Sequence, residues 1–228
     1  MIAVQNIDKW LIAKLTMKKV LITGGSLGLG LELGTLMQSK GFEVINLSRT
    51  KSQFKDIKLD LSKNNEIKKS IQIIKNNHSD FDCIILNSGV MPSKDDIGNI
   101  GFDIDYLFKV NVTGSIKLID GLFSLIKKNK SDVVVIGSTA GIGSGSKHFV
   151  YSSTKHALRG FTKLLQDKFK RDKVRVIGFH PGGFNSNLRG GAISNKYMNP
   201  KYLASLLVNI LELPKNMEVS EIVISRKK

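Results

Sequence analysis

Short runs of consecutive apolar residues alternate along the chain with longer segments in which apolar residues recur every three or four positions. The short runs predict strands that are buried on both faces, and the longer segments predict amphipathic helices. The expected strands are 20–23, 43–47, 57–59, 83–86, 133–137, 174–179 and 222–225. The expected helices are 29–39, 63–75, 102–127, 150–170 and 200–213.

The regular alternation of strand and helix predicts an α/β fold. We expect a Rossmann-type, doubly wound parallel sheet of about seven strands with helices on both faces. The pattern contains no internal repeat and no low-complexity linker, so residues 17–228 are expected to form a single domain. Ligands of such sheets bind beyond the carboxyl ends of the strands, near the point where the strand order reverses. Functional residues are therefore expected at this edge.

The first 16 residues stand apart from this pattern. They contain Trp10, the only tryptophan, but not the apolar core and cleavage site of a secretory signal. Their apolar residues fall at helical spacing: Val4, Ile7, Leu11 and Leu15. Residues 1–16 are interpreted as an N-terminal extension, either a short surface helix or residues upstream of a natural start at Met17. A membrane or targeting helix is the less favoured alternative, because the organised fold begins at Lys18.

The composition is that of an ordinary globular protein. Hydrophobic residues make up 41% of the 228 residues and charged residues 24%, which excludes a disordered chain, a collagen or a coiled-coil rod. No apolar run approaches the roughly 18 residues that cross a bilayer, so no membrane span is expected. The single cysteine, Cys83, excludes an intrachain disulfide and is consistent with a cytoplasmic location. The histidines lack metal-ligand spacing, so no metal site is expected.

The net charge of +16 is high for a protein of this size. Lysines, scattered along the chain, supply most of it, and only six cations are arginine. Bidentate phosphate capture and base readout favour arginine, so no specific nucleic-acid binding is expected. The charge is interpreted as a lysine-rich compositional bias that also attracts anionic substrates.

A glycine-rich segment follows the first strand and opens the first helix. It spans 23–30, and its glycines are Gly24, Gly25, Gly28 and Gly30. Glycines permit a tight turn there and let backbone N–H groups approach a pyrophosphate, which the helix N-terminus also attracts. No Lys-Ser/Thr pair follows the last glycine, so the segment is not a Walker A loop. It predicts a dinucleotide site that includes Gly24, Ser26, Leu27, Gly28, Leu29 and Gly30.

The residues after the second strand bear on the choice of dinucleotide. An acidic residue often holds the ribose hydroxyls of NAD at this place, but here Ser48 and Arg49 follow the strand. Arg49 can pair with a 2′-phosphate that an acid would repel, which favours NADP over NAD. A solvated basic turn is the alternative interpretation.

A third group of residues can carry acid–base chemistry. Tyr151 and Lys155 are four residues apart on a predicted helix and therefore share a face. A nearby ammonium stabilises a phenolate and so lowers the pKa of a tyrosine. Ser138, at the end of the fifth strand, can hold a carbonyl oxygen beside the tyrosine, and Asn111 lies in the helix before that strand.

Taken together, these motifs resemble the short-chain dehydrogenase/reductase family over residues 18–226. The resemblance implies a catalytic tetrad of Asn111, Ser138, Tyr151 and Lys155. It also implies cofactor contacts at Asp60 and Leu61 after strand three, at Asn87, Ser88 and Gly89 after strand four, and at Pro181, Gly182, Phe184 and Ser186 after strand six. The cofactor residues then also include Tyr151 and Lys155.

The chain departs from the family pattern at four positions. Leu86 and Ser88 differ from the usual Asn-Asn-Ala-Gly, and Ser186 replaces a threonine but keeps its hydroxyl. Leu27 stands where some members that prefer NADP carry a basic residue. Residues 187–198 are expected to form the substrate lid, and the small size of this segment argues against a deep dedicated pocket. Arg189 in this segment is expected to meet either an anionic substrate or solvent.

The resemblance implies an NADP-dependent oxidoreductase that interconverts a carbonyl compound and its alcohol, with Tyr151 as the general acid/base. The alternatives are the same enzyme with a preference for NAD and a non-catalytic nucleotide-binding regulatory protein on the same fold. Family members usually associate through two long helices, so a homodimer or homotetramer is expected. The implied interface is formed by helices 102–127 and 150–170, with apolar residues such as Leu158, Phe161 and Leu165; the alternative is that these residues only pack on the sheet.

Overall fold

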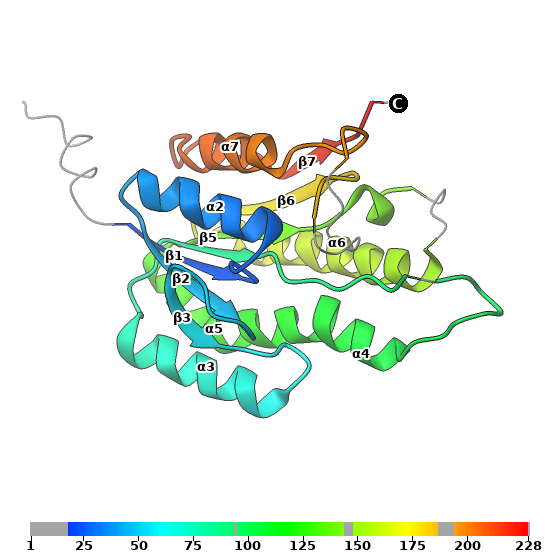
Figure 1. The fold of residues 1–228 in the computed structure, drawn as a ribbon. Coiled ribbons are helices and arrows are strands. Elements are labelled where there is room, and N and C mark those ends of the chain that lie inside the picture. Colours follow the sequence, from blue (N-terminus) through cyan, green and yellow to red (C-terminus); the bar gives the residue numbers. More distant parts are fainter. Residues whose placement is uncertain (1–17, 94, 144–147, 187–193, 228) are drawn as a thin grey trace, which may run out of the picture.

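The computed structural model describes residues 18–93, 95–143, 148–186 and 194–227. The described chain forms one seven-stranded sheet in which every neighbouring pair is parallel, in the order β3-β2-β1-β4-β5-β6-β7 (Figure 1). The strands are β1 (Lys19–Thr23), β2 (Glu43–Ser48), β3 (Lys55–Lys58), β4 (Cys83–Leu86), β5 (Asp132–Ile136), β6 (Val176–Pro181) and β7 (Glu221–Ile224). This confirms the expected Rossmann-type sheet.

Helices cover both faces of the sheet (Figure 1). The helices are α2 (Gly28–Ser39), α3 (Asn64–Asn77), α4 (Ile104–Phe108), α5 (Gly114–Asn129), α6 (Phe149–Phe169) and α7 (Pro200–Leu211). A π-helical turn, η1 (Lys109–Thr113), joins α4 to α5, and a short 3₁₀ turn, η2 (Thr139–Gly141), follows β5. None of the helices in the described residues is long and apolar enough to span a membrane. The N-terminal residues 1–16 lie outside the described part of the chain.

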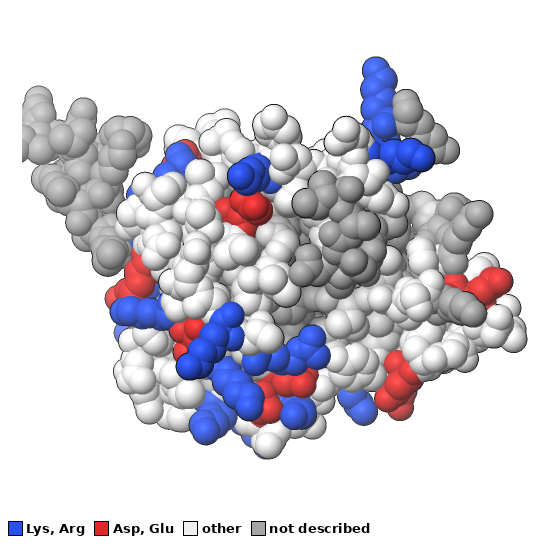
Figure 2. Space-filling model, viewed as in Figure 1, with Lys and Arg blue, Asp and Glu red and all other residues white. Residues whose placement is uncertain are grey.

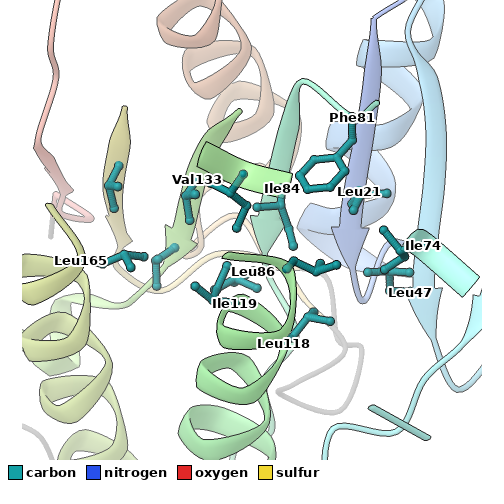
Figure 3. Close-up of a cluster of buried hydrophobic side chains, with 14 of the residues drawn as sticks. Leu21, Leu47, Ile74, Phe81, Ile84, Leu86, Leu118, Ile119, Val133 and Leu165 are labelled. Atoms are coloured by element: carbon teal, nitrogen blue, oxygen red, sulfur yellow. The ribbon is translucent and has the colours of Figure 1, made fainter. Parts of the chain in front are cut away.

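Two apolar cores hold the helices to the sheet. On one face, α3, α5 and α6 pack on the strands through residues such as Leu118, Ile119 and Leu165 (Figure 3). On the other face, α2 and α7 pack on the strands through residues such as Leu33 and Leu207. Both faces of the central strands are therefore apolar, which explains the consecutive apolar residues in their sequences.

The position of β1 in the sheet creates the ligand-binding edge. Since β1 pairs with β2 on one side and with β4 on the other, the chain crosses in opposite directions from it. The segments that follow β1 and β4 therefore leave the sheet in opposite directions. This divergence opens a crevice at the carboxyl ends of the two strands. The glycine-rich segment starts at the end of β1.

Two expected elements differ from the observed ones by two residues at each end. The helix expected at 102–127 begins at Ile104, contains the π-helical turn η1 and ends at Asn129. The strand expected at 174–179 begins at Val176 and extends through Pro181, because His180 and Pro181 continue the pairing with β7. Periodicity cannot mark such ends, because they depend on a π turn and on a neighbouring strand.

The apolar residues expected in an oligomer interface belong to the core instead. Leu158 and Leu165 are buried, and the partly buried Phe161 packs against the same cluster under α6. Their position follows from the helical period, which turns this face of α6 toward the sheet. Leu164, by contrast, is 70% exposed on the same helix.

Candidate active site

A cavity of about 690 Å³ lies along the carboxyl edge of the sheet. Among the described residues that are expected to contact cofactor or substrate, all line it except Gly30 and Asn111. The lining residues from the sequence-based prediction are Gly24, Ser26, Leu27, Gly28, Leu29, Ser48, Arg49, Asp60, Leu61, Asn87, Ser88, Gly89, Ser138, Tyr151, Lys155, Pro181, Gly182, Phe184 and Ser186. Residues from seven separate chain segments therefore meet in one place.

The glycine-rich segment lines the cavity with Gly24 and residues 26–29. Gly24 and Gly28 have positive φ angles of 67° and 56°. Residues with a Cβ atom rarely adopt this backbone conformation. Gly30 lies behind the wall, where an added Cβ would come within 2.2 Å of the Gly24 carbonyl oxygen. Helix α2 begins at Gly28, and no side chain caps its N-terminus. Its first N–H groups are therefore available to an anion in the cavity.

A buried asparagine holds the glycine-rich segment to the sheet. Asn46 is fully buried in β2, and its Oδ1 accepts a hydrogen bond of 2.7 Å from the Gly25 N–H. Its Nδ2 donates to Asp56 Oδ1 at 2.7 Å and to Ser48 Oγ at 3.0 Å. A polar residue inside an apolar strand is the sequence signal for this contact.

The end of the cavity beyond β2 is polar. Ser26 Oγ lies 2.8 Å from Thr50 Oγ1, and the exposed Arg49 donates from Nη1 to the Tyr106 hydroxyl at 3.1 Å. Asp60 is the carboxylate among the residues that line the cavity. Burial acts to raise the pKa of Asp60, but hydrogen bonds from Ser62 and the charges of Arg49 and Lys63 hold it below its ordinary value. Asp60 is therefore ionised at neutral pH.

The other end of the cavity brings together Ser138, Tyr151 and Lys155. The side chain of Lys155 is buried, and its Nζ donates to the Ile136 carbonyl at 3.2 Å and lies 5.7 Å from the centre of the Tyr151 ring. Burial lowers the pKa of Lys155 to about 8. Ser138 follows β5, and its Oγ accepts a hydrogen bond from the Ala140 N–H. A hydroxyl, a phenol and an ammonium thus lie at one end of the cavity.

Asn111 does not line the cavity but supports its wall. Its Oδ1 accepts from the Val90 N–H at 2.8 Å, and its Nδ2 donates to the Val90 carbonyl at 2.9 Å. The same Nδ2 lies 3.1 Å from Thr154 Oγ1, which donates to the Tyr151 carbonyl at 2.7 Å. The π-helical turn η1 places the fully buried Asn111 between the loop after β4 and helix α6.

Several residues of the site were not identified from the sequence. His148, Val90 and Met91 line the cavity near Tyr151, and the His148 ring meets the Tyr151 ring edge-on at 6.5 Å between centroids. Thr154 carried a weak signal, because it lies inside the Tyr-x-x-x-Lys segment. Val90 and Met91 follow the Asn-Ser-Gly segment directly, but they lie in a loop without periodicity.

The cavity lining does not include His156, His180 or Cys83. His156 Nδ1 lies 2.9 Å from the Ser152 carbonyl oxygen. His180 is 1% exposed, and its Nε2 lies 3.1 Å from Glu221 Oε1. Cys83 is buried. Arg189 and most of the expected lid lie outside the described residues, and in the described residues no group of acidic, histidine or cysteine side chains could hold a metal ion.

A dinucleotide fits the residues along this cavity. The uncapped N-terminus of α2 provides N–H groups for a pyrophosphate, and Gly28 leaves open space because an added Cβ would meet only Ser186, at 3.9 Å. Asp60 and Arg49 lie toward one end and Lys155 toward the other. Fold and site together define a nucleotide-binding protein of the doubly wound α/β class.

Comparisons with known proteins identify the family. The model of the short chain dehydrogenase family matches residues 18–196. An uncharacterized oxidoreductase of Staphylococcus saprophyticus is 21% identical over 225 residues, which cover 91% of this chain and 96% of the relative. The chain therefore belongs to the short-chain dehydrogenase family and is an oxidoreductase of that family.

Solved structures share the fold. The alcohol dehydrogenase of the archaeon Thermococcus sibiricus, complexed with 5-hydroxy-NADP, has a TM-score of 0.84 at 20% identity and covers 91% of this chain and 96% of its own. A short chain dehydrogenase from Leptospira borgpetersenii with bound NAD⁺ has a TM-score of 0.80 at 24% identity and covers 92% and 91%. Both cofactors therefore occur among similar structures.

Proposed function

We propose that the protein is an NADP-dependent oxidoreductase that interconverts a carbonyl compound and its alcohol. The observation that carries the proposal is the convergence of Ser138, Tyr151 and Lys155 in a cavity that is also lined by an uncapped helix N-terminus. NADPH, when bound, supplies the hydride that reduces the carbonyl carbon.

Each residue of the catalytic end has a proposed role. Tyr151 Oη gives its proton to the carbonyl oxygen as the general acid and is left as a phenolate. Ser138 Oγ donates a hydrogen bond to the same oxygen and orients it. The Lys155 ammonium, 5.7 Å from the centre of the Tyr151 ring, stabilises the phenolate in this proposal, and it is also assigned the contact with the nicotinamide ribose. Asn111 fixes the wall beside Tyr151 through Val90 and Thr154.

The proposed preference for NADP rests on the polar end of the cavity. Ser26, Arg49 and Thr50 gather there, and a 2′-phosphate needs hydrogen-bond donors and a cation. Asp60 is the residue proposed to contact the adenine. An NAD-preferring enzyme of this fold typically holds the ribose hydroxyls with an acid after β2, and Ser48 stands in that place.

The rival hypothesis is a non-catalytic protein that only binds the nucleotide. A protein that only senses a nucleotide does not require a phenol and a hydroxyl next to a buried ammonium.

We also propose that the protein forms a homodimer or homotetramer through the outer faces of the long helices. The exposed Leu164 on α6 supports that proposal.

The substitution Tyr151→Phe tests the proposed reaction. It removes the acidic proton but keeps the ring, so carbonyl reduction should fall by about 10²–10⁴-fold, the usual contribution of a general acid. The measurement is the decrease in NADPH absorbance with a panel of aldehydes and ketones.

Fluorescence titration with NADPH provides the control for this experiment. Nucleotide affinity should stay near the wild-type value, because the phenol is expected to contact only the nicotinamide end. Turnover by Tyr151→Phe close to that of the wild type would refute the role of Tyr151. Nucleotide binding without turnover on any carbonyl would favour the non-catalytic hypothesis.

A further inference from the structure

The helix that carries Tyr151 lacks a local cap. Helix α6 begins at Phe149, and the side chain of its N-cap residue, His148, makes no capping hydrogen bond. The first backbone N–H groups of a helix have no partner within the helix and need one from elsewhere. Tyr151 is the third residue of α6, so its own N–H is one of these groups.

A distant carboxylate provides the missing cap. Asp95 Oδ1 accepts from the Val150 N–H at 2.9 Å, and Oδ2 accepts from the Tyr151 N–H at 2.8 Å. The Asp95 carbonyl also accepts from the Phe149 N–H at 3.4 Å. Asp95 is 3% exposed, so these bonds are shielded from water. A carboxylate at a helix N-terminus also interacts favourably with the helix dipole.

This cap fixes one side of the Tyr151 backbone, and a second contact fixes the other. The Tyr151 carbonyl accepts from Thr154 Oγ1 at 2.7 Å, and Thr154 accepts from Asn111 Nδ2 at 3.1 Å. Asn111 in turn holds the backbone of Val90, which lines the cavity. The loop after β4 is therefore attached to α6 at two points, one on each side of Tyr151.

We propose that Asp95 is a positioning residue. It caps α6 from the loop after β4 and thereby holds Tyr151 at the distance from the substrate oxygen that proton transfer requires. The inference deepens the proposed function and rests on it. General-acid catalysis is sensitive to distance, and a displacement of about 1 Å can cost roughly 10²-fold in rate. Asp95 does not touch the cofactor or the reacting atoms in this proposal.

The test compares three variants of the full chain. Asp95→Ala removes the cap, and Asp95→Asn keeps the shape but replaces one acceptor oxygen with an amino group that cannot accept. Asp96→Ala is the matched control, because Asp96 is the next residue, carries the same charge and is exposed. Hydrogen–deuterium exchange reports on the amides of the first turn of α6, and thermal melts show that each variant is folded.

A second substitution separates capping from other effects of the carboxylate. Serine is a favoured N-cap residue, so His148→Ser provides a local cap for the same N–H groups. Asp95→Ala should then raise exchange less in the His148→Ser background than in the wild-type background. An equal effect in both backgrounds would overturn the capping role.

The kinetic arm measures kcat and the NADPH dissociation constant. We expect kcat of Asp95→Ala to fall about tenfold or more, because the acid is displaced. The kcat of Asp95→Asn should lie between that of Asp95→Ala and that of the wild type, and NADPH affinity should stay near the wild-type value.

Faster exchange with an unchanged kcat would overturn the positioning role. Unchanged exchange would overturn the cap itself. If the wild type reduces no carbonyl, the proposed function fails, while the exchange measurement still decides whether Asp95 caps α6.

Discussion

At the scale of the residue, the burial of Lys155 affects both the stability of the fold and the proposed reaction. Lys155 is 4% exposed, donates to the Ile136 carbonyl and faces the Tyr151 ring. Burial lowers its pKa from 10.5 to about 8, so the charged form is destabilised in the folded protein. At neutral pH the ammonium still predominates, and the proposed reaction needs that charge beside the phenol. The position proposed to serve catalysis therefore works against stability.

The substitution Lys155→Met should stabilise the nucleotide-free protein at pH 7. Because the folded-state pKa is lowered, burying the charge costs stability below pH 8, and this cost disappears as the pH rises from about 8 toward 10.5. A pKa change of this size corresponds to on the order of 3 kcal/mol. Urea unfolding of both proteins at pH 7, 8, 9 and 10 should show a stability difference that shrinks with pH. A difference that does not depend on pH would contradict this account.

Arg49 is the residue on which the proposed NADP preference depends. The substitution Arg49→Ala should weaken NADPH binding by roughly 10–100-fold, since hydrogen bonds to charged groups contribute about 1.5–3 kcal/mol. NADH lacks the 2′-phosphate, so its affinity should change little. Fluorescence titrations with both nucleotides measure the two effects. Lys51→Ala is the control, because Lys51 is exposed nearby but does not line the cavity; equal losses for both nucleotides would refute the 2′-phosphate role.

At the scale of the element, the edge of the sheet away from the cavity is held by a buried ion pair. Arg175, just before β6, donates from Nη2 and Nε to the Asp132 carboxylate at the start of β5, at 2.6 and 3.1 Å. It also donates to the Leu211 and Leu213 carbonyls at the end of α7. One guanidinium thus connects two strands and a helix. This contact explains a charged residue within the run expected to be a strand.

The substitution Arg175→Met should destabilise the protein by about 3–5 kcal/mol, because it leaves a buried carboxylate with only part of its compensation. Lys215→Met is the matched control. Lys215 also contacts Asp132, at 2.6 Å, but its side chain is 53% exposed, so its loss should cost less than about 1 kcal/mol. Urea unfolding followed by far-UV circular dichroism measures both. Equal losses would contradict the importance of burial.

At the scale of the whole molecule, the charge of +16 raises the question of how cations and anions are distributed on the surface. On the face drawn in Figure 2, lysines and arginines gather over α3 and the strands beside it, with acidic residues among them. Lys68 and Lys69 are exposed on α3. The mixed sign of this face is what a lysine-rich compositional bias predicts, whereas a nucleic-acid groove on it would need an uninterrupted positive path.

The proposed self-association can be tested on two helices. If copies of the chain meet through the outer face of α6, Leu164→Glu should reduce the mass in solution toward the 25.2 kDa of the monomer. Burying an unpaired charge at an apolar interface costs more free energy than most single contacts contribute to association. Tyr202→Glu on α7, where Tyr202 is 77% exposed, is the control. Light scattering after gel filtration measures the mass. Dissociation by Tyr202→Glu alone would place the interface on α7 and refute the proposal.

The sequence determined the class of fold and most of the cavity lining. Strands buried on both faces carry consecutive apolar residues, and helices carry an apolar stripe, so the alternation could be read directly from the chain. The residues of the proposed site follow strand ends or share a helical face, as Tyr151 and Lys155 do. Parallel strands bring all their carboxyl ends to one edge, and the topology alone therefore collects these residues.

The tertiary structure decided the contacts between segments without a repeating pattern. Asp95 reaches Tyr151 across 56 positions in the sequence, and Asn46 reaches Gly25 across 21. Nothing in the sequence distinguishes Asp95, which caps α6, from the exposed Asp96 beside it. In α6, by contrast, the helical period already separates the buried Leu165 from the exposed Leu164. Local spacing specifies which elements form, but a hydrogen bond between distant residues depends on how the packed elements orient their side chains, which only the assembled fold determines.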